Sequence, residues 1–245
     1  MATNQDVKKN VLKFEEDVRA GGGYEYTGDR FSASLANACI SEAIAAAYDF
    51  RGKTVLDVGC GDGAYTLQFP SLGAGRTYGV DPASAAIEAA RKRAVENGVE
   101  DVVIFQEGNV YDLQRFLADN EVDCIVFRGV LHHLPDPERA IRSLRGFAGT
   151  IVVLEPNGYN PVLKILEKVS KYHIEHEERS FSASTLSTWL HGAGFSDRKI
   201  SYCNLVPMFC PDMLARCCKW CEPLVEKIPF IKQLCCGQVV IAASR

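Results

Sequence analysis

A glycine-rich turn directly after an apolar segment is the part of this sequence with the clearest chemical potential. Residues 55–58 form an apolar run that contains Asp57, and this run leads into Gly59, Gly61 and Gly63. Glycine suits such a turn because its backbone accepts positive φ angles and because a ligand can approach it without meeting a Cβ atom. The pattern predicts a ligand-binding loop at the end of a strand, although a purely structural turn gives the same pattern.

Two classes of ligand fit this loop. The pattern G-x-G-x-x-A that begins at Gly59 matches the dinucleotide fingerprint, and Asp81 stands where such folds place the acid that binds a ribose. Three other features favour a methyl donor. A carboxylate at Asp57 would repel a pyrophosphate but attract a sulfonium or ammonium group. A third glycine follows at Gly63, and residues 1–50 precede the first strand, whereas dinucleotide folds often begin with that strand.

Further motifs follow in chain order. They are Tyr-Gly-Val-Asp at 78–81, Gly-Asn-Val-Tyr-Asp-Leu at 108–113 and Phe-Arg-Gly-Val-Leu-His-His-Leu-Pro-Asp-Pro at 127–137. With the glycine loop, these motifs make residues 50–155 resemble the class I S-adenosylmethionine-dependent methyltransferase superfamily, and the last motif resembles that of its small-molecule enzymes.

The resemblance implies that S-adenosylmethionine is the cofactor. It places the ribose hydroxyls on Asp81 and the adenine near Asn109, where the family often has Asp. An amide oxygen still accepts a hydrogen bond from the adenine amino group. The implied cofactor residues are Asp57, Gly59, Cys60, Gly61, Gly63, Asp81, Pro82, Asn109, Val110 and Arg128.

The order of secondary structure agrees with an α/β fold. Short β-branched runs alternate with helical segments, which is typical of βαβ units. Strands are expected at 54–58, 77–80, 102–105, 124–127, 150–154, 195–202 and 238–242, and helices at 34–48, 64–69, 84–97, 111–118 and 137–146. The last helix has a clear start, because Asp136 can cap it and Pro137 suits its first position.

The resemblance implies a Rossmann-like, doubly wound, seven-stranded mixed sheet within one domain. Residues 1–50 are then an N-terminal helical cap, residues 51–155 the cofactor-binding core, and residues 156–245 the substrate-side half. Ligands of open α/β sheets lie beyond the carboxyl ends of the strands, so the loop after the fifth strand should hang over the site. Residues 204–236 are expected as a lid inserted between the last two strands.

Catalytic residues are less well marked. The cofactor supplies an activated methyl group, so the protein chiefly aligns the reactants, and a base is needed only where the acceptor loses a proton. His132 and His133 are the candidates for that base, and the alternative is that both only shape their loop. Glu155 and Asn157 follow the fifth strand and are candidates for substrate contact, unless Pro156 and its neighbours merely form a turn.

The N-terminal segment offers three more substrate-side candidates. Tyr24, Tyr26 and Arg30 precede the sheet, and such a segment caps the cofactor in related enzymes. The alternative is a surface loop flanked by glycines.

The C-terminal region is rich in cysteine and apolar residues. Ten cysteines without a secretory signal predict reduced thiols in the cytoplasm. Met213, Cys217, Cys221 and Leu224 share one helical face, where cysteine serves as a small hydrophobe. No metal site is expected there, nor in the run 172–179, whose spacing matches no metal motif and suggests a solvated helix face.

The apolar segments of residues 204–236 have three interpretations. Residues 205–210 and 228–231 could pack as an ordinary lid, cover a hydrophobic acceptor, or rest on a bilayer as a peripheral contact. No segment is apolar for long enough to predict a transmembrane helix.

The functional prediction is a methyltransferase for a small, partly apolar molecule. The net charge of -4 predicts no nucleic-acid partner. The region after the fourth strand lacks the Asn/Asp-Pro-Pro-aromatic run of enzymes that methylate planar amino groups, and also a Pro-Cys nucleophile. Two alternatives stay open: a non-catalytic module that binds the cofactor and acts through a partner, and an NAD-dependent oxidoreductase.

Overall fold

The computed structural model describes residues 30–170 and 179–245. Tyr24, Tyr26 and nearly all of the run 172–179 lie outside these residues. Within them, one mixed sheet has the strand order β3-β2-β1-β4-β5-β7-β6. Its strands are β1 (Thr54–Val58), β2 (Arg76–Asp81), β3 (Val103–Glu107), β4 (Cys124–Arg128), β5 (Thr150–Pro156), β6 (Asp197–Cys203) and β7 (Gln238–Ser244).

The sheet confirms the predicted seven-stranded, Rossmann-like fold. β1 to β5 pair in parallel, while β7 runs antiparallel between β5 and β6. The strand order reverses between β1 and β4, which is where open α/β sheets bind their ligands. The chain therefore places its glycine loop, directly after β1, at the position where a ligand is expected.

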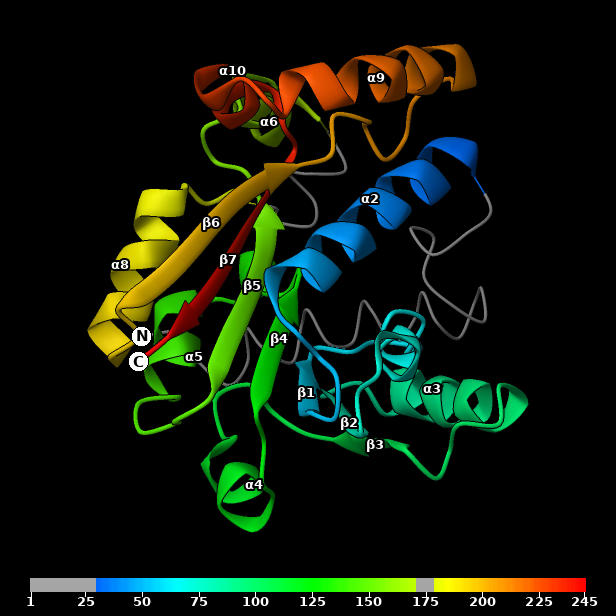
Figure 1. Ribbon diagram of the computed structural model, residues 1–245, viewed down its shortest axis with the longest axis vertical. Helices are drawn as coiled ribbons and strands as arrows, with labels where there is room; N and C mark the ends of the chain where they lie inside the picture. The colour runs from blue at the N-terminus through cyan, green and yellow to red at the C-terminus, as the bar shows by residue number, and fades with distance from the viewer. Residues whose placement is uncertain (1–29, 171–178) are drawn as a thin grey trace.

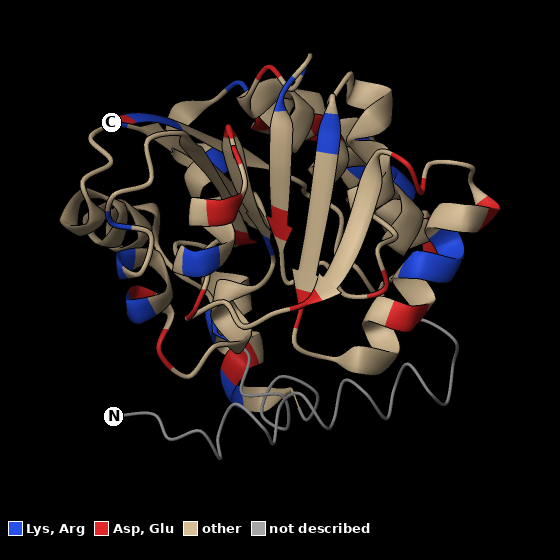
Figure 2. Cartoon of the chain, turned by 90° about the horizontal axis from the view of Figure 1, so that it is seen from below, with Lys and Arg blue, Asp and Glu red and all other residues tan. Residues whose placement is uncertain are grey.

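Helices cover both faces of the sheet (Figures 1 and 2). The helices of the core are α2 (Phe31–Ala47), α3 (Ser84–Glu96), α4 (Gln114–Asp119), α5 (Pro137–Arg142) and α8 (Ala183–Ala193). Residues of α2 pack with Val55, Val126 and Val152 on one face. Residues of α5 and α8 pack on the other face, against Leu56 and Ile151 among others.

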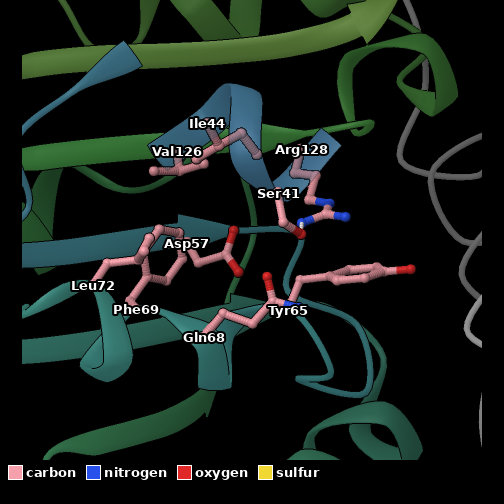
Figure 3. Close-up of a pocket in the computed structure, with 9 residues that line it drawn as sticks. All are labelled: Ser41, Ile44, Asp57, Tyr65, Gln68, Phe69, Leu72, Val126 and Arg128. Carbon is pink, nitrogen blue, oxygen red and sulfur yellow. Dashed lines mark hydrogen bonds between the residues drawn. The ribbon is translucent and has the colours of Figure 1, made fainter. Parts of the chain in front are cut away.

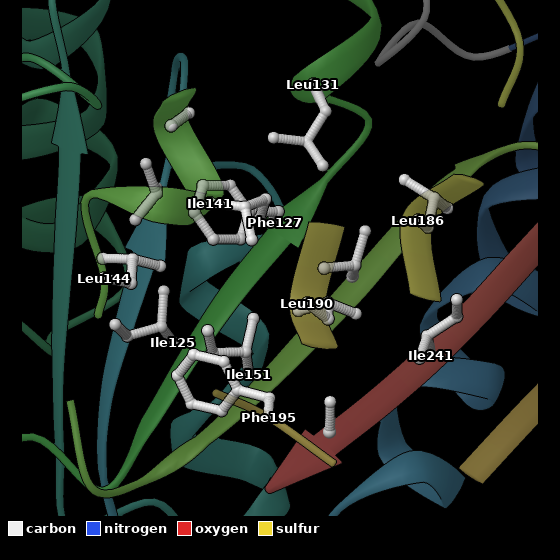
Figure 4. Close-up of a cluster of buried hydrophobic side chains, with 14 of the residues drawn as sticks. Ile125, Phe127, Leu131, Ile141, Leu144, Ile151, Leu186, Leu190, Phe195 and Ile241 are labelled. Carbon is white, nitrogen blue, oxygen red and sulfur yellow. The ribbon is translucent and has the colours of Figure 1, made fainter. Parts of the chain in front are cut away.

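The α5–α8 face carries the larger part of the core (Figure 4). Phe127, Leu190 and Phe195 are completely buried there. Burial of side chains of this size contributes about 1.5–3 kcal/mol each. This layer holds β4 and β5 rigidly, and the loops at their carboxyl ends build part of the site.

Several helix boundaries differ from the sequence prediction. The helix expected at 64–69 is only a 3₁₀ turn, η2 (Thr66–Gln68), because Pro70 has no amide hydrogen with which to continue a helix. The helix expected at 111–118 begins at Gln114, because the Asn109 side chain and carbonyl hold the preceding residues in a turn. Asp136 and Pro137 start α5 as expected, since the Asp136 carboxylate accepts a hydrogen bond from the Arg139 amide at 3.0 Å.

Helices α6 (Pro161–Val169), α9 (Asp212–Val225) and α10 (Pro229–Cys235) lie together beyond the carboxyl ends of β5 and β6 (Figure 1). α9 and α10 occupy the insertion predicted between the last two strands. The prediction of which face of α9 packs is wrong, however. Met213 is 79% and Leu224 67% exposed, whereas Ala215 and Glu222 are buried. A helical stripe shows that a helix is amphipathic, but it does not show which side the protein covers.

Gly63 illustrates how the glycine loop is built into the core. Its φ is +76°, and an added Cβ atom would lie 2.7 Å from the Phe105 ring and 2.9 Å from the Cβ of Ala90. Gly98 has a similar φ of +64° with nothing within 4 Å of an added Cβ. The two positions therefore separate conformational strain from steric overlap.

We expect Gly63→Ala to reduce the free energy of unfolding by about 1–3 kcal/mol more than Gly98→Ala. Both variants carry the left-handed strain of roughly 1–2 kcal/mol, but only the first adds overlap. Urea denaturation of both variants measures the difference. Equal losses of unfolding free energy in the two variants would show that Phe105 and Ala90 move away from the added methyl group without an energetic cost.

Candidate functional site

The glycine loop, the loop after β2 and the loop after β4 enclose one large cavity at the carboxyl edge of the sheet. Gly59 and Gly61 have φ angles of +72° and +54°. A Cβ atom at Gly59 would lie 2.6 Å from Val130, so glycine is required there by the loop after β4 as well as by its own backbone. The backbone of both glycines lines the cavity.

Asp81 joins the glycine loop to the end of β2. One of its carboxylate oxygens accepts a hydrogen bond from the Gly61 amide at 3.0 Å, and the other accepts one from the Ala83 amide at 2.9 Å. Burial raises the pKa of Asp81, and these two amides oppose that shift. Each oxygen keeps a second lone pair, so the carboxylate can still accept two hydroxyl groups of a ligand.

Asp57 lies at the deep end of the cavity. It is 4% exposed, and the Thr66 hydroxyl donates to it at 2.6 Å. Burial raises the pKa of Asp57 to about 6, although the Thr66 bond and the Arg128 charge act in the opposite direction. A carboxylate held in this way is costly to ionise until a cation lies beside it.

Arg128 and Tyr65 stand next to Asp57 (Figure 3). The Arg128 guanidinium lies 3.5 Å from the centre of the Tyr65 ring and donates to the Ser41 hydroxyl on α2 at 2.9 Å. Behind these side chains is a small pocket of about 10 Å³, which holds at most one water molecule. Arg128 therefore fastens the N-terminal helix over the cavity and places a positive charge at its wall.

The structure brings together all of the predicted cofactor residues except Gly63. Cys60, Pro82, Asn109 and Val110 line the same cavity as Asp57, Asp81 and Arg128. The Asn109 side-chain oxygen already accepts the Tyr111 amide at 3.0 Å, which leaves it one further lone pair. Gly63 is turned toward Phe105 and Ala90 instead, so its role in the structure is packing.

The cavity continues beyond the glycine loop into an apolar region. Its volume is about 1010 Å³, at the top of the roughly 300–1,000 Å³ range of single small-molecule sites. The apolar end is lined by Val162, Leu163, Leu166, Leu205, Val206, Met208, Phe209 and Leu234. The volume and the two unlike ends suit two ligands side by side, one polar and one apolar.

His132 sits between the two ends and is oriented by Glu155. The His132 Nδ1 atom lies 2.7 Å from a Glu155 oxygen, and both side chains are at least nine-tenths buried. When Nδ1 carries the proton for this bond, Nε2 is the basic nitrogen of the ring. His132 and His133 both line the cavity, with ring centroids 3.8 Å apart.

Contrary to the sequence prediction, Glu155 does not face the acceptor. It is fully buried and absent from the cavity wall, because its carboxylate accepts hydrogen bonds from the Val130, Leu131 and His132 amides. It therefore holds the loop after β4 rather than a substrate.

Asn157 also has a structural role in place of the predicted substrate contact. It is completely buried, and its amide donates to the Gln233 and Cys236 carbonyls at 2.8 and 2.9 Å. These bonds fasten α10 to the end of β5. Arg30, the remaining N-terminal candidate that the structure describes, precedes α2 and lies outside the cavity wall, 5.5 Å from the Phe209 ring.

Sequence reasoning missed the residues of α6 that line the apolar end. The loop after β5 does hang over the site, as expected, but its helix was not assigned. Asn160 caps α6 by accepting the Val162 amide at 2.9 Å, and Pro161 occupies the first helical position. That Asn-Pro pair before an apolar run was an available signal for the helix.

The comparisons agree with this geometry. Residues 56–159 match the family described as "Methyltransferase domain". A relative from Neisseria meningitidis, named ubiquinone biosynthesis O-methyltransferase, is 35% identical over 39% of this chain and 39% of its own length. The protein of that name from Haemophilus ducreyi is 29% identical over 64% of this chain and 71% of its own length.

The chain therefore contains a methyltransferase domain. The matched region, residues 56–159, covers the glycine loop, the ends of β2 and β4, and the loop after β5. This match favours S-adenosylmethionine, the methyl donor that the motifs predict, over the dinucleotide interpretation of the glycine pattern.

The fold agrees over the whole chain. A Thermotoga maritima structure, described as an S-adenosylmethionine-dependent methyltransferase and possible histamine N-methyltransferase, superposes with a TM-score of 0.64 at 17% identity, covering 98% of both chains. The matches to the curated relatives are shorter: the chain spans about two fifths of the length of the Neisseria methyltransferase.

Asp57 makes stability depend on pH in a defined direction. A carboxyl group whose pKa rises on folding stabilises the folded state below about pH 4, and this contribution is lost as the pH rises through about 6. The shift of about two pKa units corresponds to roughly 3 kcal/mol.

The free energy of unfolding of Asp57→Asn, compared with that of the parent, should therefore rise by about 3 kcal/mol as the pH increases from about 4 to about 7. Denaturant unfolding at several pH values measures the difference. Thr66→Val removes the donor to the carboxylate and should enlarge the pH dependence of the protein. A constant difference between Asp57→Asn and the parent would contradict a raised Asp57 pKa.

Proposed function

We propose that this protein transfers the methyl group of S-adenosylmethionine to a small, partly apolar molecule. The observation that carries the proposal is the continuous cavity of about 1010 Å³, which joins the glycine loop to an apolar region under α6. Such a cavity can hold donor and acceptor in line and exclude water, which is most of what this reaction requires of a protein.

The donor would occupy the polar end. In this proposal Asp81 accepts the ribose hydroxyls, Asn109 and Val110 contact the adenine, and Gly59 and Gly61 let the donor approach the backbone. Asp57 lies where the ammonium and sulfonium groups can offset its charge, which suits its raised pKa. Arg128 brings a positive charge that suits the carboxylate of the donor.

The acceptor would occupy the apolar end, among Leu163, Leu166 and Phe209. These side chains offer hydrophobic surface and few polar groups, so they favour an acceptor with a hydrocarbon or aromatic part. The two relatives named ubiquinone biosynthesis O-methyltransferase make a hydroxyl acceptor with an apolar tail the first class to test.

A hydroxyl acceptor loses a proton on methylation. His132 is our candidate for the base, because Glu155 fixes its ring and the residue lines the cavity. Glu155 acts through His132 and is a positioning residue.

Label transfer tests this function. With labelled S-adenosylmethionine and a catechol that bears an apolar chain, we expect an organic-extractable methylated product. Asp81→Ala should weaken S-adenosylhomocysteine binding at least tenfold, or roughly 1.5–3 kcal/mol. Leu166→Asp should leave that affinity near the parent value and abolish turnover, because it places a charge at the acceptor end.

The exposed Asp101→Ala variant is the control and should behave like the parent in both measurements. Tight binding of the donor with no transfer to any apolar acceptor would instead favour a cofactor-binding module that acts through a partner. Unchanged affinity in a folded Asp81→Ala protein would contradict the placement of the ribose.

We also propose that the face formed by α6, α9 and α10 rests on an anionic membrane surface, from which an apolar acceptor reaches the cavity. Large apolar side chains are exposed on these helices: Val162, Ile165, Val169, Met213, Leu214, Trp220, Leu224, Phe230, Ile231 and Leu234. Val162 and Leu234 also line the cavity, so this face is continuous with the acceptor end.

The charges of this face fit a lipid surface. The exposed basic residues are Lys168, Arg216 and Lys227, while Asp212 is the exposed acid of these helices. Apolar side chains surrounded by lysine and arginine are typical of helices that lie in the plane of a bilayer interface. No helix in residues 30–170 or 179–245 is long and apolar enough to cross a membrane.

Trp220 reports this contact directly, because it is 85% exposed. We expect its fluorescence emission to shift to the blue with phosphatidylcholine vesicles that contain phosphatidylglycerol, and the protein to co-sediment with them. A Leu224→Ser, Phe230→Ser variant should lose co-sedimentation, whereas Val95→Ser, on the exposed side of α3, should not. If the parent protein does not bind these vesicles, or if Val95→Ser loses as much co-sedimentation as the double variant, a bilayer contact is excluded. A protein partner would then remain for this face.

A further inference from the structure

A second group of reactive side chains lies outside the cavity, between α2 and α9. The sulfur of Cys39 and the carboxylate oxygens of Glu222 and Glu226 lie within 4.8 Å of one another. Cys39 is 6% exposed and Glu222 4% exposed. A thiol and two carboxylates thus converge at a buried point where two helices from opposite ends of the chain meet.

One oxygen of this group lacks a hydrogen-bond partner among the described residues. Lys219 pairs with Glu222, and the charge of Lys232 also acts on Glu226, but the buried Oε1 atom of Glu226 accepts no hydrogen bond. A buried carboxylate oxygen close to a second carboxylate is stabilised by a proton or by a bound cation.

The loop after β6 holds both carboxylates in place. The Leu205 amide donates to Glu222 at 3.0 Å, and the Asn204 backbone bonds to Glu226. Asn204 has a φ of +66°, a conformation that non-glycine residues rarely adopt. Each carboxylate oxygen has two lone pairs, so these bonds leave electron pairs for a further ligand.

The sulfur of Cys39 lies in a buried cluster that also contains Cys203, at the end of β6. A cysteine binds a metal ion as the thiolate. Cys203 comes directly before Asn204, so one short segment orients both the sulfur and the carboxylates.

We propose that Cys39, Glu222 and Glu226 bind a Zn²⁺ ion. Sulfur and carboxylate oxygen are both ligands of zinc, and tetrahedral bonds of about 2.3 Å and 2.0–2.2 Å place such atoms roughly 3.5 Å apart. Small side-chain rotations bring the three atoms to that spacing. One thiolate and two carboxylates then balance the charges of the ion and Lys219, and Glu226 Oε1 gains a partner.

The ion would connect the N-terminal helix to the wall of the cavity. Asn204 and Leu205, whose amides hold the two glutamates, also line the cavity near its apolar end. Zinc would therefore fasten α2, α9 and this loop together. The proposal does not depend on the identity of the methyl acceptor, because the three ligands lie outside the cavity wall.

The test uses the full chain after treatment with a chelator. Added Zn²⁺ should raise its melting temperature, and added Co²⁺ should give the near-ultraviolet band of a thiolate–cobalt bond. Cys39→Ser should abolish that band. Glu226→Gln should keep the protein folded, because the amide has the size and shape of the carboxyl group, and should weaken Zn²⁺ binding by roughly 100-fold or more.

Cys217→Ser is the matched control, since this exposed cysteine lies on α9 away from the cluster. It should keep the cobalt band, the stabilisation and the affinity of the parent. The proposal is overturned when Zn²⁺ fails to stabilise the parent. It is equally overturned when Glu226→Gln binds Zn²⁺ as tightly as the parent, which would show that a proton serves that site, or when Cys217→Ser loses as much as Cys39→Ser.

Discussion

Buried carboxylates that accept backbone amides at the carboxyl edge of the sheet hold the glycine loop, the loop after β2 and the loop after β4. Loops lack the regular hydrogen bonds of strands, and a buried amide without an acceptor costs about 1–3 kcal/mol. Asp81 supplies the acceptor for the Gly61 amide, and Glu155 supplies it for three amides of the loop after β4. The chemistry of the site therefore rests on side chains that a ligand meets only in part.

This arrangement gives each acid a different task. Asp81 remains at the wall of the cavity, where its unused lone pairs can meet a ligand, while Glu155 is fully enclosed and orients His132. Asp57 accepts a hydrogen bond from the Thr66 hydroxyl, and burial raises its pKa to about 6. The three carboxylates thus provide a rigid anchor, a support for a histidine, and a site that favours a cation.

The sequence predicts the fold well because its signals are local. Strand positions follow from β-branched runs between glycines, and the expected cofactor residues come from adjacent loops that the parallel sheet brings to one edge. Glu155 and Asn157 show the limit. Both directly follow the correct strand, but whether a side chain points to a ligand or to a neighbouring loop depends on long-range hydrogen bonds. The partners of Asn157 belong to α10, far away in the sequence.

The C-terminal helices show the same limit of sequence prediction, here for the burial of a helix face. Helical spacing correctly grouped Met213, Cys217 and Leu224, yet that face is exposed and the face with Glu222 is buried. Nor could spacing join Cys39 to Glu222 and Glu226, because α2 and α9 meet only through the fold. Contacts between distant segments decide these features, and a pattern within one segment carries no information about them.

A crystal structure of the protein with S-adenosylhomocysteine bound tests the central claim most directly. The account predicts the ribose hydroxyls on the Asp81 carboxylate, the adenine beside Asn109 and Val110, and the ammonium group near Asp57. The sulfur atom should face the apolar region between His132 and Leu166. A ligand bound elsewhere, or one whose sulfur faces away from that region, would contradict it.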